Sequence, residues 1–592
     1  MRTMSITTLI CLVLGVASAA PRIPSSEVCI PQHDSNPRRR AVGVSERNSG
    51  FTYGPSLIGE AAPFPNGTLG NARSKADYAL WSIDREEIDK RIATDLQEIQ
   101  EAIQANGGLK TWDDYEKILY DGKLKQSNPR GPAPGIIANA TQDLLFSMER
   151  LSEHPYAVRL VKADEKLPFN VDTKIVSKLV GAGATLHTLQ ASRRLFLVDH
   201  SYQNEYSLPS VVQRFSVACS AYFYIDPKTN DFLPLAIKTN SGSDLIYTPL
   251  DSFEDWLLAK MMFNANDMFH AQMLHLVISH DISEAVHQAA LHTLSDNHPI
   301  MVILERLMLQ GYSSRIVGEE LCFNPGGHWD QSMAYDQFSC RKFVTDQWPV
   351  AGKFQAGYLE TDLKSRGLLN DKGASIFKSF PFWNDAKDIR NAYRAFFKSF
   401  VDSYYKTELD LVGDFEVRNW FVEASEYAKT RDFPSKHSLS KETLIDVLTH
   451  FGFLLSVGHH STNGGAPIAS ATLPFHIPAL YNPPPTTKGV KTLLPYLPDV
   501  PTALHYIGFT ASFNRPFYSS DGRTLQNAFS QDEKLKKLNK ATNDAAARFL
   551  RTLQDPSNKI QARNFDENGL SDGMPFVYRT LDPNYIPFFC AV

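Results

Sequence analysis

The stretch WLLAKMMFNANDMFHAQMLHLVISHDISEAVHQAALHTLSDNHPIMVILERLM, residues 256–308, is the most informative part of this 592-residue chain. It is strongly apolar, and His270, His275 and His280 recur in it every five residues. On a regular α-helix five steps leave neighbouring histidines about 140° apart, too far round to share one metal ion. A π-type turn, with i to i+5 hydrogen bonds, brings such a pair onto one face. If two of these histidines bind one ion, the spacing predicts a π-bulge between them.

Two further features add oxygen donors to these imidazoles. His459 and Asn463 are four residues apart, so an ordinary helix places them on one face. The chain ends in the apolar run Tyr585–Val592, which favours the interior, yet burying an isolated carboxylate is prohibitive. A buried cation resolves that conflict. Imidazole, amide and carboxylate donors without a thiolate favour an octahedral redox metal with one water over tetrahedral zinc.

Each feature also has an ordinary explanation. A histidine on an apolar helix is commonly a core residue with a hydrogen-bond partner. A His–Asn pair at this spacing often occurs by chance, and the tail can pack on the surface with its carboxylate in water. The fixed interval of three histidines is what favours the metal site over these alternatives.

Composition and charge exclude several classes of protein. Hydrophobic residues make up 43% and charged residues 21%, which is the balance of a folded globular protein. The net charge is -5 with a pI near 6.4, so neither a nucleic acid nor an anionic membrane is expected as a partner. Six cysteines in 592 residues are too few for a disulfide scaffold.

The first 19 residues resemble a secretory signal peptide. Arg2 precedes the apolar run Leu9–Val16, and Ala17-Ser18-Ala19 has the small-x-small form of a cleavage site. We therefore expect a secreted, extracellular protein. No other segment has 18 unbroken apolar residues, so no integral membrane association is expected. The sequons at Asn66 and Asn139 become candidate glycosylation sites in that compartment.

The composition along the chain indicates one large, mainly α-helical domain with minor β-structure. Residues 20–75 are rich in Pro, Ser, Gly and Arg, so we predict an extended leader there. Residues 76–592 form the predicted domain, with a β-rich or irregular stretch at about 157–250 and a late helix at about 531–554. No internal repeat and no long later linker divides it.

In combination these motifs resemble the lipoxygenase family, from about residue 100 to the end of the chain. The WLLAK stretch with its five-spaced histidines and the later His298-Pro299 is similar to the family's histidine-rich helix. His459-xxx-Asn463 resembles the second ligand pair, and Val592 stands where most members end in isoleucine. The chain leaves no room for the family's N-terminal β-barrel lipid-binding domain. With the signal peptide and the terminal valine, this resembles the secreted fungal lipoxygenases that use manganese instead of iron.

The resemblance implies a role for particular residues. By their positions in the family motifs, the metal ligands are His275, His280, His459, Asn463 and the Val592 carboxylate. His270 and His460 would be neighbours of ligands, and Gln272 is similar to a glutamine that lies near the metal. Gly318 occupies the position where glycine or alanine biases oxygen insertion. Arg515 looks like the arginine that holds the fatty-acid carboxylate, although a structural salt bridge is an equal alternative.

The resemblance also implies a reaction. A metal(III)-hydroxide takes a hydrogen atom from the bis-allylic carbon of a polyunsaturated fatty acid such as linoleic or α-linolenic acid. O2 then adds to give a hydroperoxide. Manganese is favoured over iron on resemblance alone, because the same nitrogen and oxygen donors hold both. We expect one ion per chain and a monomer whose partners are the fatty acid and O2. The rival functions are a hydroperoxide isomerase or lyase on the same fold and a non-catalytic secreted lipid carrier.

Overall fold

The computed structural model describes residues 28–54, 64–210, 213–240, 244–464, 470–530 and 532–591. The expected signal peptide and the terminal Val592 lie outside these residues. No helix within the described ranges is long and apolar enough to cross a membrane.

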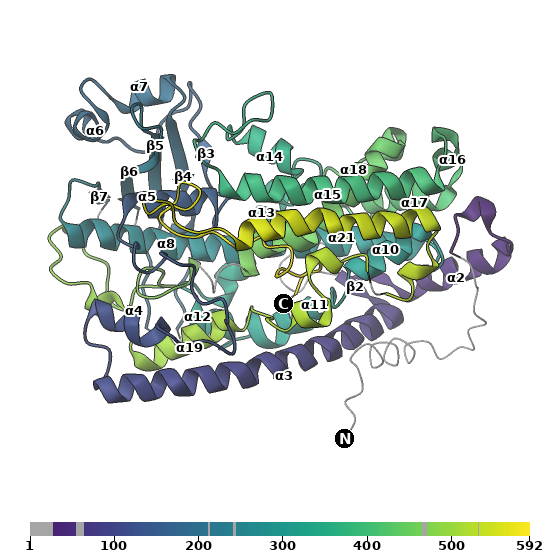
Figure 1. The fold of residues 1–592 in the computed structure, drawn as a ribbon, viewed down its shortest axis with the longest axis horizontal. Coiled ribbons are helices and arrows are strands. Elements are labelled where there is room, and N and C mark those ends of the chain that lie inside the picture. The colour runs from purple at the N-terminus through teal and green to yellow at the C-terminus, as the bar shows by residue number, and fades with distance from the viewer. Residues whose placement is uncertain are drawn as a thin grey trace.

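The histidine-rich stretch forms the central helix of the molecule (Figure 1). It consists of α8 (Phe253–His275), the π-helix η4 (Leu276–Asp281) and α9 (Ile282–Thr293). Ser252 caps the start of α8 by accepting a hydrogen bond from the Asp255 amide. Nearly every residue of α8 and α9 is buried, as expected for a helix that is apolar on all sides.

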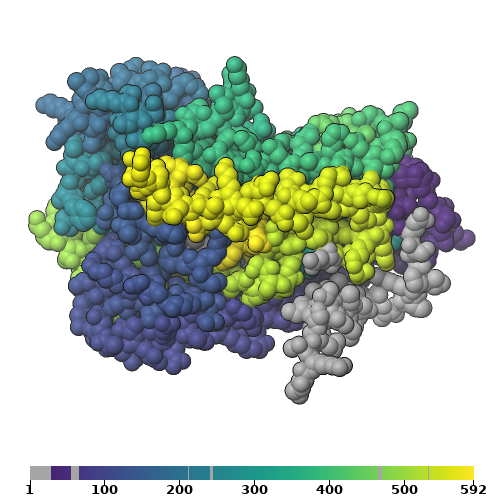
Figure 2. Space-filling view, in the orientation of Figure 1, coloured from purple at the N-terminus to yellow at the C-terminus, as the bar shows by residue number. Residues whose placement is uncertain are grey.

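Long helices enclose this central helix. The 40-residue α3 (Gly67–Asn106) runs along one side of the molecule (Figure 1). On the other side α15 (Pro381–Tyr404) packs against both α18 (Lys441–Phe453) and α21 (Lys540–Gln561). The C-terminal part of the chain forms a continuous band across the front in Figure 2. The metal-ligand candidates at the end of α8, in η4 and in the segment after α18 therefore lie inside a helical shell.

A glycine allows one of these helix pairs to pack closely. A Cβ atom at Gly452 of α18 would lie 2.7 Å from Cε1 of Tyr393 on α15, which is closer than real contacts allow. The Tyr393 hydroxyl in turn donates to Ser456 Oγ at 3.2 Å. This contact fixes α15 against the segment that leads to His459.

Five antiparallel strands form a sheet at one end of the molecule (Figure 1). Their order follows the chain: β3 (Arg159–Leu160), β4 (Leu195–Asp199), β5 (Cys219–Ile225), β6 (Phe232–Thr239) and β7 (Ile246–Tyr247). Tyr222 of β5 pairs with Leu197 on one side and Ala236 on the other. The stretch predicted as β-rich thus contains the sheet, but also the helices α6 (Thr173–Val180) and α7 (Leu186–Ala191).

The remaining elements are helices and strands of up to 15 residues. They are η1 (Pro31–His33), α2 (Pro37–Gly50), β1 (Thr52–Gly54), β2 (Phe64–Asn66), α4 (Trp112–Tyr120), α5 (Asp143–Met148), η2 (Glu149–Leu151), η3 (Ser201–Glu205), α10 (Pro299–Leu307), α11 (Ser313–Val317), η5 (Gly318–Cys322), α12 (His328–Ser332), α13 (Gln337–Ala351), α14 (Leu359–Ser365), α16 (Glu408–Gly413), α17 (Phe415–Val422), η6 (Glu423–Tyr427), η7 (Lys436–Ser438), η8 (Leu454–Gly458), η9 (His460–Gly464), η11 (Leu494–Tyr496), α19 (Val500–Ala511), α20 (Tyr518–Asp521), η12 (Leu525–Asn527) and η13 (Leu535–Lys537).

The predicted extended leader is wrong for the described part of residues 20–75. Residues 37–50 form α2, which Asn36 caps, and α3 begins at Gly67, inside the predicted leader. Arg40 is buried, and its Nε lies 2.6 Å from Glu416 Oε1. A run of arginines normally indicates a solvent-exposed segment. Arg40 instead pairs with Glu416, which is 376 positions away and therefore cannot be recognised as its partner from the local sequence. The late helix begins at Lys540, after the cap Asn539, rather than at residue 531.

Candidate metal centre

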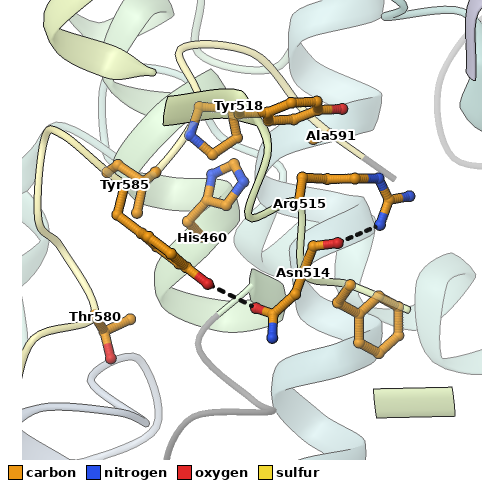
Figure 3. A pocket seen from close by; sticks show the side chains of 10 residues that line it. His460, Asn514, Arg515, Tyr518, Thr580, Tyr585 and Ala591 are labelled. Atoms are coloured by element: carbon orange, nitrogen blue, oxygen red, sulfur yellow. Dashed lines mark hydrogen bonds between the residues drawn. The ribbon is translucent and has the colours of Figure 1, made fainter. Parts of the chain in front are cut away.

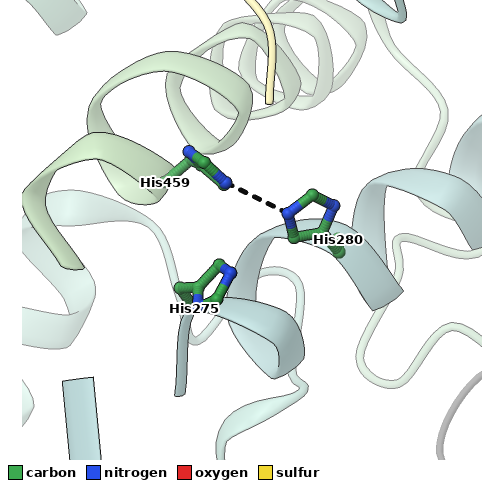
Figure 4. A group of neighbouring side chains, drawn as sticks. All are labelled: His275, His280 and His459. Carbon is green, nitrogen blue, oxygen red and sulfur yellow. Dashed lines mark hydrogen bonds between the residues drawn. The ribbon is translucent and has the colours of Figure 1, made fainter. Parts of the chain in front are cut away.

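Three buried imidazoles meet between the central helix and the segment after α18 (Figure 4). His275 ends α8, His280 lies in η4, and His459 follows η8. One ring nitrogen from each lies within 4.8 Å of the other two, and Nε2 of His459 is 3.0 Å from Nε2 of His280. Among the described residues this is the one group of three or more His, Cys, Asp or Glu side chains arranged to hold a metal ion.

The predicted π-bulge between His275 and His280 is confirmed. Leu276–Asp281 is a π-helix, so the i to i+5 pair lies on one face. In the wider turn some main-chain carbonyls lack the usual hydrogen bond from the helix backbone, and hydroxyl side chains donate to them instead. Ser279 Oγ donates to the His275 carbonyl oxygen within η4. Serine in this position therefore stabilises the irregular turn that brings the two ligands together.

The second ligand segment is also π-helical, which the sequence did not predict. An ordinary helix was expected through His459 and Asn463, but η8 (Leu454–Gly458) precedes His459 and η9 (His460–Gly464) follows it. Thr462 Oγ1 donates to the Gly458 carbonyl at 2.9 Å and lies 3.0 Å from that of His459. The serine and threonine residues close to the ligands were the sequence signal for a π-helix. Their hydroxyls donate hydrogen bonds to carbonyls that the backbone would bond in a regular helix.

Burial keeps all three imidazoles neutral. It lowers the pKa of His275 to about 4, and it lowers the pKa values of His280 and His459 well below the ordinary value. The Nδ1–H of His275 donates to the Gln272 carbonyl oxygen, which leaves the Nε2 lone pair for a ligand bond. Neutral rings with outward lone pairs are the form of histidine that binds metals.

Two amide side chains complete the neighbourhood. Asn463 is 2% exposed, and its Oδ1 has no hydrogen-bond partner in the part of the chain that the structure describes. Gln272 is fully buried and donates through Nε2 to the Thr462 carbonyl at 3.1 Å, so it ties α8 to η9. An unbonded, buried amide oxygen four residues after His459 is, together with the neutral imidazoles, a donor set that fits a divalent cation.

The end of the chain lies in the interior, as its apolar composition predicts. Phe588, Phe589, Cys590 and Ala591 are all buried. The next residue, Val592, falls outside the described residues, so its predicted carboxylate ligand stays a prediction. Among the described residues, Cys219, Cys322, Cys340 and Cys590 are free thiols.

The neighbouring histidines have other partners, as expected. His270 Nδ1 lies 2.8 Å from the Tyr202 hydroxyl, on the part of α8 that precedes the cluster. His460 Nδ1 donates to the Ser456 carbonyl at 2.8 Å. Neither belongs to the three-histidine group.

A small, partly open cavity lies beside the second ligand segment and the chain end (Figure 3). Arg515 lines it together with His460 and Ala591, the neighbours of His459 and Val592. The Arg515 guanidinium is 7% exposed and donates to the carbonyl oxygens of Ser512 and Asn514, the latter at 2.8 Å. The structure thus places a buried cation at a cavity next to the candidate metal centre. Sequence reasoning missed Asn514 because a single asparagine carries no pattern.

The structure describes three other predicted site residues. Gly318 is buried at the start of the π-helix η5, where its carbonyl accepts from the Phe323 amide at 2.7 Å. Asn66 is exposed and caps α3. Asn139 is half-buried, and its Nδ2, the atom that would carry a glycan, donates to the Pro575 carbonyl at 2.7 Å.

Known proteins are similar to this chain in sequence and in fold. The family model for lipoxygenases matches residues 147–494, more than half of the chain. The manganese lipoxygenase of Fusarium oxysporum (strain Fo5176) is 44% identical over 576 residues, which are 96% of this chain and 93% of the relative. The manganese lipoxygenase of Nakataea oryzae is 42% identical over 589 residues, 98% of this chain and 94% of the relative. A solved manganese lipoxygenase matches with a TM-score of 0.93 and 42% identity, covering 96% of this chain and 100% of that one. The chain therefore belongs to the lipoxygenase family, the dioxygenases of polyunsaturated fatty acids.

Proposed function

We propose that this dioxygenase works with one manganese ion per chain. The proposed ligands are three imidazoles, an amide oxygen and the terminal carboxylate: His275, His280, His459, Asn463 and Val592. The observation that carries the proposal is the meeting of three neutral, buried imidazoles within 4.8 Å. The substrates are fatty acids with a cis,cis-1,4-pentadiene, such as linoleic and α-linolenic acid, and the products are hydroperoxides.

When bound, the metal supplies the one-electron oxidation that removes a hydrogen atom from the bis-allylic carbon. The protein's residues do the rest. Neutral ligands leave the centre electron-poor, and the Gln272 bond to Thr462 holds the two ligand segments in register. Buried apolar side chains beside the ligands, Met273 and Val277 among them, exclude water. Arg515 binds the substrate carboxylate, and Gly318 governs where O2 is inserted.

The choice of manganese rests on the relatives. Nitrogen and oxygen donors hold iron and manganese alike, so the ligand set does not separate them. The relatives from Fusarium oxysporum and Nakataea oryzae, which match nearly the whole chain, are manganese lipoxygenases. Iron is the alternative that elemental analysis decides.

We also propose that the protein is a secreted monomer. Secretion is proposed from the signal-like residues 1–19. Of the two sequons, Asn66 is the better glycan acceptor, because it is exposed while the Asn139 amide is bonded within the protein. Mass spectrometry of the protein from the culture medium tests the cleavage after Ala19 and the glycan at Asn66.

One assay separates the proposed function from its rivals. Oxygen consumption and conjugated-diene absorbance are measured with linoleic acid, alongside the manganese and iron content of the same sample. The proposal predicts stoichiometric manganese, O2 uptake and diene formation. Metal without O2 uptake, but with consumption of added hydroperoxide, would favour an isomerase or lyase. Folded protein that binds fatty acid without a redox metal would favour a lipid carrier.

The chain end offers a sharper test of the ligand set. Adding one alanine after Val592 moves the terminal carboxylate, whereas Val592→Ile keeps it in place. We expect the extended variant to lose metal and activity and the isoleucine variant to retain both. Equal metal content in the two variants would refute the carboxylate ligand.

A further inference from the structure

Asn514 presents an unused hydrogen-bond donor at the cavity beside the candidate metal centre. The residue is 2% exposed and lines that cavity next to Arg515. The Tyr585 hydroxyl donates to its Oδ1 at 3.4 Å, which orients the amide (Figure 3). Its Nδ2 has no hydrogen-bond partner among the residues that the structure describes. A buried donor of this kind destabilises the protein unless a ligand accepts from it.

The charges around this donor favour an anionic ligand. Arg515 and Asn514 are consecutive, and both line the cavity. Three charged side chains act electrostatically on the Arg515 guanidinium. The Asp84 carboxylate favours its positive charge, whereas the guanidinium groups of Arg85 and Arg523 oppose it. Asp84 is already bonded by two nitrogens of Arg523 at 2.6 and 2.9 Å and by the Tyr518 hydroxyl at 2.9 Å. Asp84 is thus engaged by Arg523, and Arg515 brings a positive charge to the cavity that Asn514 lines, where a ligand carboxylate can meet it.

We propose that Asn514 Nδ2 is a second anchor for the fatty-acid carboxylate, beside the Arg515 guanidinium. This inference rests on the proposed function, in which Arg515 holds that carboxylate. A carboxylate offers two oxygens, so it accepts from the guanidinium and from the amide at once. The Tyr585 bond keeps the amide nitrogen directed away from that hydroxyl, so the donor is oriented before the substrate arrives. Asn514 thereby selects free fatty acids over their neutral esters.

The test compares linoleic acid with methyl linoleate in four forms of the enzyme. Asn514→Leu removes the donor. Asn514→Asp keeps an acceptor for Tyr585 but replaces the donor by a carboxylate oxygen. Thr510→Val is the matched control, because Thr510 is also buried and, among the described residues, its hydroxyl donates to two carbonyls of its own helix, those of Tyr506 and Ile507, both at 3.1 Å. KM and kcat are measured for each form and substrate.

Loss of a hydrogen bond to a charged group predicts that Asn514→Leu raises KM for linoleic acid about ten-fold, with kcat near the wild-type value. Asn514→Asp raises KM for the acid further, because like charges then meet. Neither variant changes KM for the ester, and Thr510→Val changes neither value. If Asn514→Leu does not fold, Asn514→Asp decides the question alone. An equal rise for acid and ester, a fall in kcat alone, or no change would overturn the inference.

Two further measurements complete the design. Oleic acid has no bis-allylic carbon, so its binding by isothermal titration calorimetry reports the anchor without turnover. We expect weaker oleate binding in both Asn514 variants, and unchanged binding would count against the inference. Absence of O2 uptake by wild-type, metal-loaded enzyme refutes the proposed function instead, so the two failures are distinct.

Discussion

Replacing Gln272 with leucine tests whether the tie between the two ligand segments supports the metal. The change removes the bond from Nε2 to the Thr462 carbonyl, 3.1 Å long and fully buried. Leaving a buried acceptor unpaired costs about 1–3 kcal/mol of folding stability. Loss of an outer partner of metal ligands typically lowers metal affinity about 10–100-fold, or about 1.4–2.8 kcal/mol.

The central helix supplies a matched control. Gln288 is also fully buried, and its Nε2 donates to the main-chain carbonyl of Thr52 at 3.0 Å. Among the described residues its Oε1 has no hydrogen-bond partner, as is the case for Gln272. Gln288→Leu should therefore lower the free energy of unfolding by a similar amount. Because Gln288 contacts neither ligand segment through this bond, it should leave metal affinity unchanged.

The assay is competition for manganese by a chelator, followed by the EPR signal of the released ion, with chemical denaturation run on the same samples. We expect only Gln272→Leu to release manganese at lower chelator concentration. Equal metal affinity in the two variants, or a larger loss in Gln288→Leu, would refute the idea that the α8–η9 contact positions the ligands.

Three other predictions follow from the same structure. His275→Ala, His280→Ala and His459→Ala should each lose metal, while His270→Ala should retain most of it because that ring bonds Tyr202; elemental analysis checks this. Gly318→Ala should change the position of oxygen insertion more than the rate, which chiral chromatography of the products measures. Burial raises the pKa of Glu153 to about 8 from 4.5, so the folded protein keeps a proton that the unfolded chain releases. The stability that this group contributes is therefore complete below about pH 4.5 and is lost as the pH rises towards about 8. In denaturant titrations, Glu153→Gln should be more stable than wild type at about pH 8.5 and similar to it at about pH 4.

The sequence predicted the part of the site that depends on helical periodicity. Histidines five apart on an apolar stretch required a π-turn, and η4 provides it. The His459–Asn463 spacing was compatible with an ordinary helix, so nothing in it indicated that η8 and η9 are π-helical. Ser279 and Thr462 were visible in the sequence, but their role was not. Their hydroxyls donate to main-chain carbonyls that lack a backbone partner only because the turns are π-helical.

Contacts between distant parts of the chain could not be predicted. Arg40 belongs to a polar, arginine-rich segment, and its burial depends on its pairing with Asp34 and with the distant Glu416. The Asn514 donor is similar, because its unbonded state follows from the packing of Tyr585 and the cavity around it. A single sequence reports helical periodicity, as the spacing of His275 and His280 shows, but not such long-range partners.

The central claim is that one manganese ion lies between His275, His280 and His459. A crystal of the purified enzyme, with anomalous diffraction recorded on both sides of the manganese absorption edge, tests it most directly. One strong peak per chain, within bonding distance of the three imidazole nitrogens, is the expected result. A peak elsewhere, or fully folded and active enzyme whose three histidines enclose no metal peak, would contradict it.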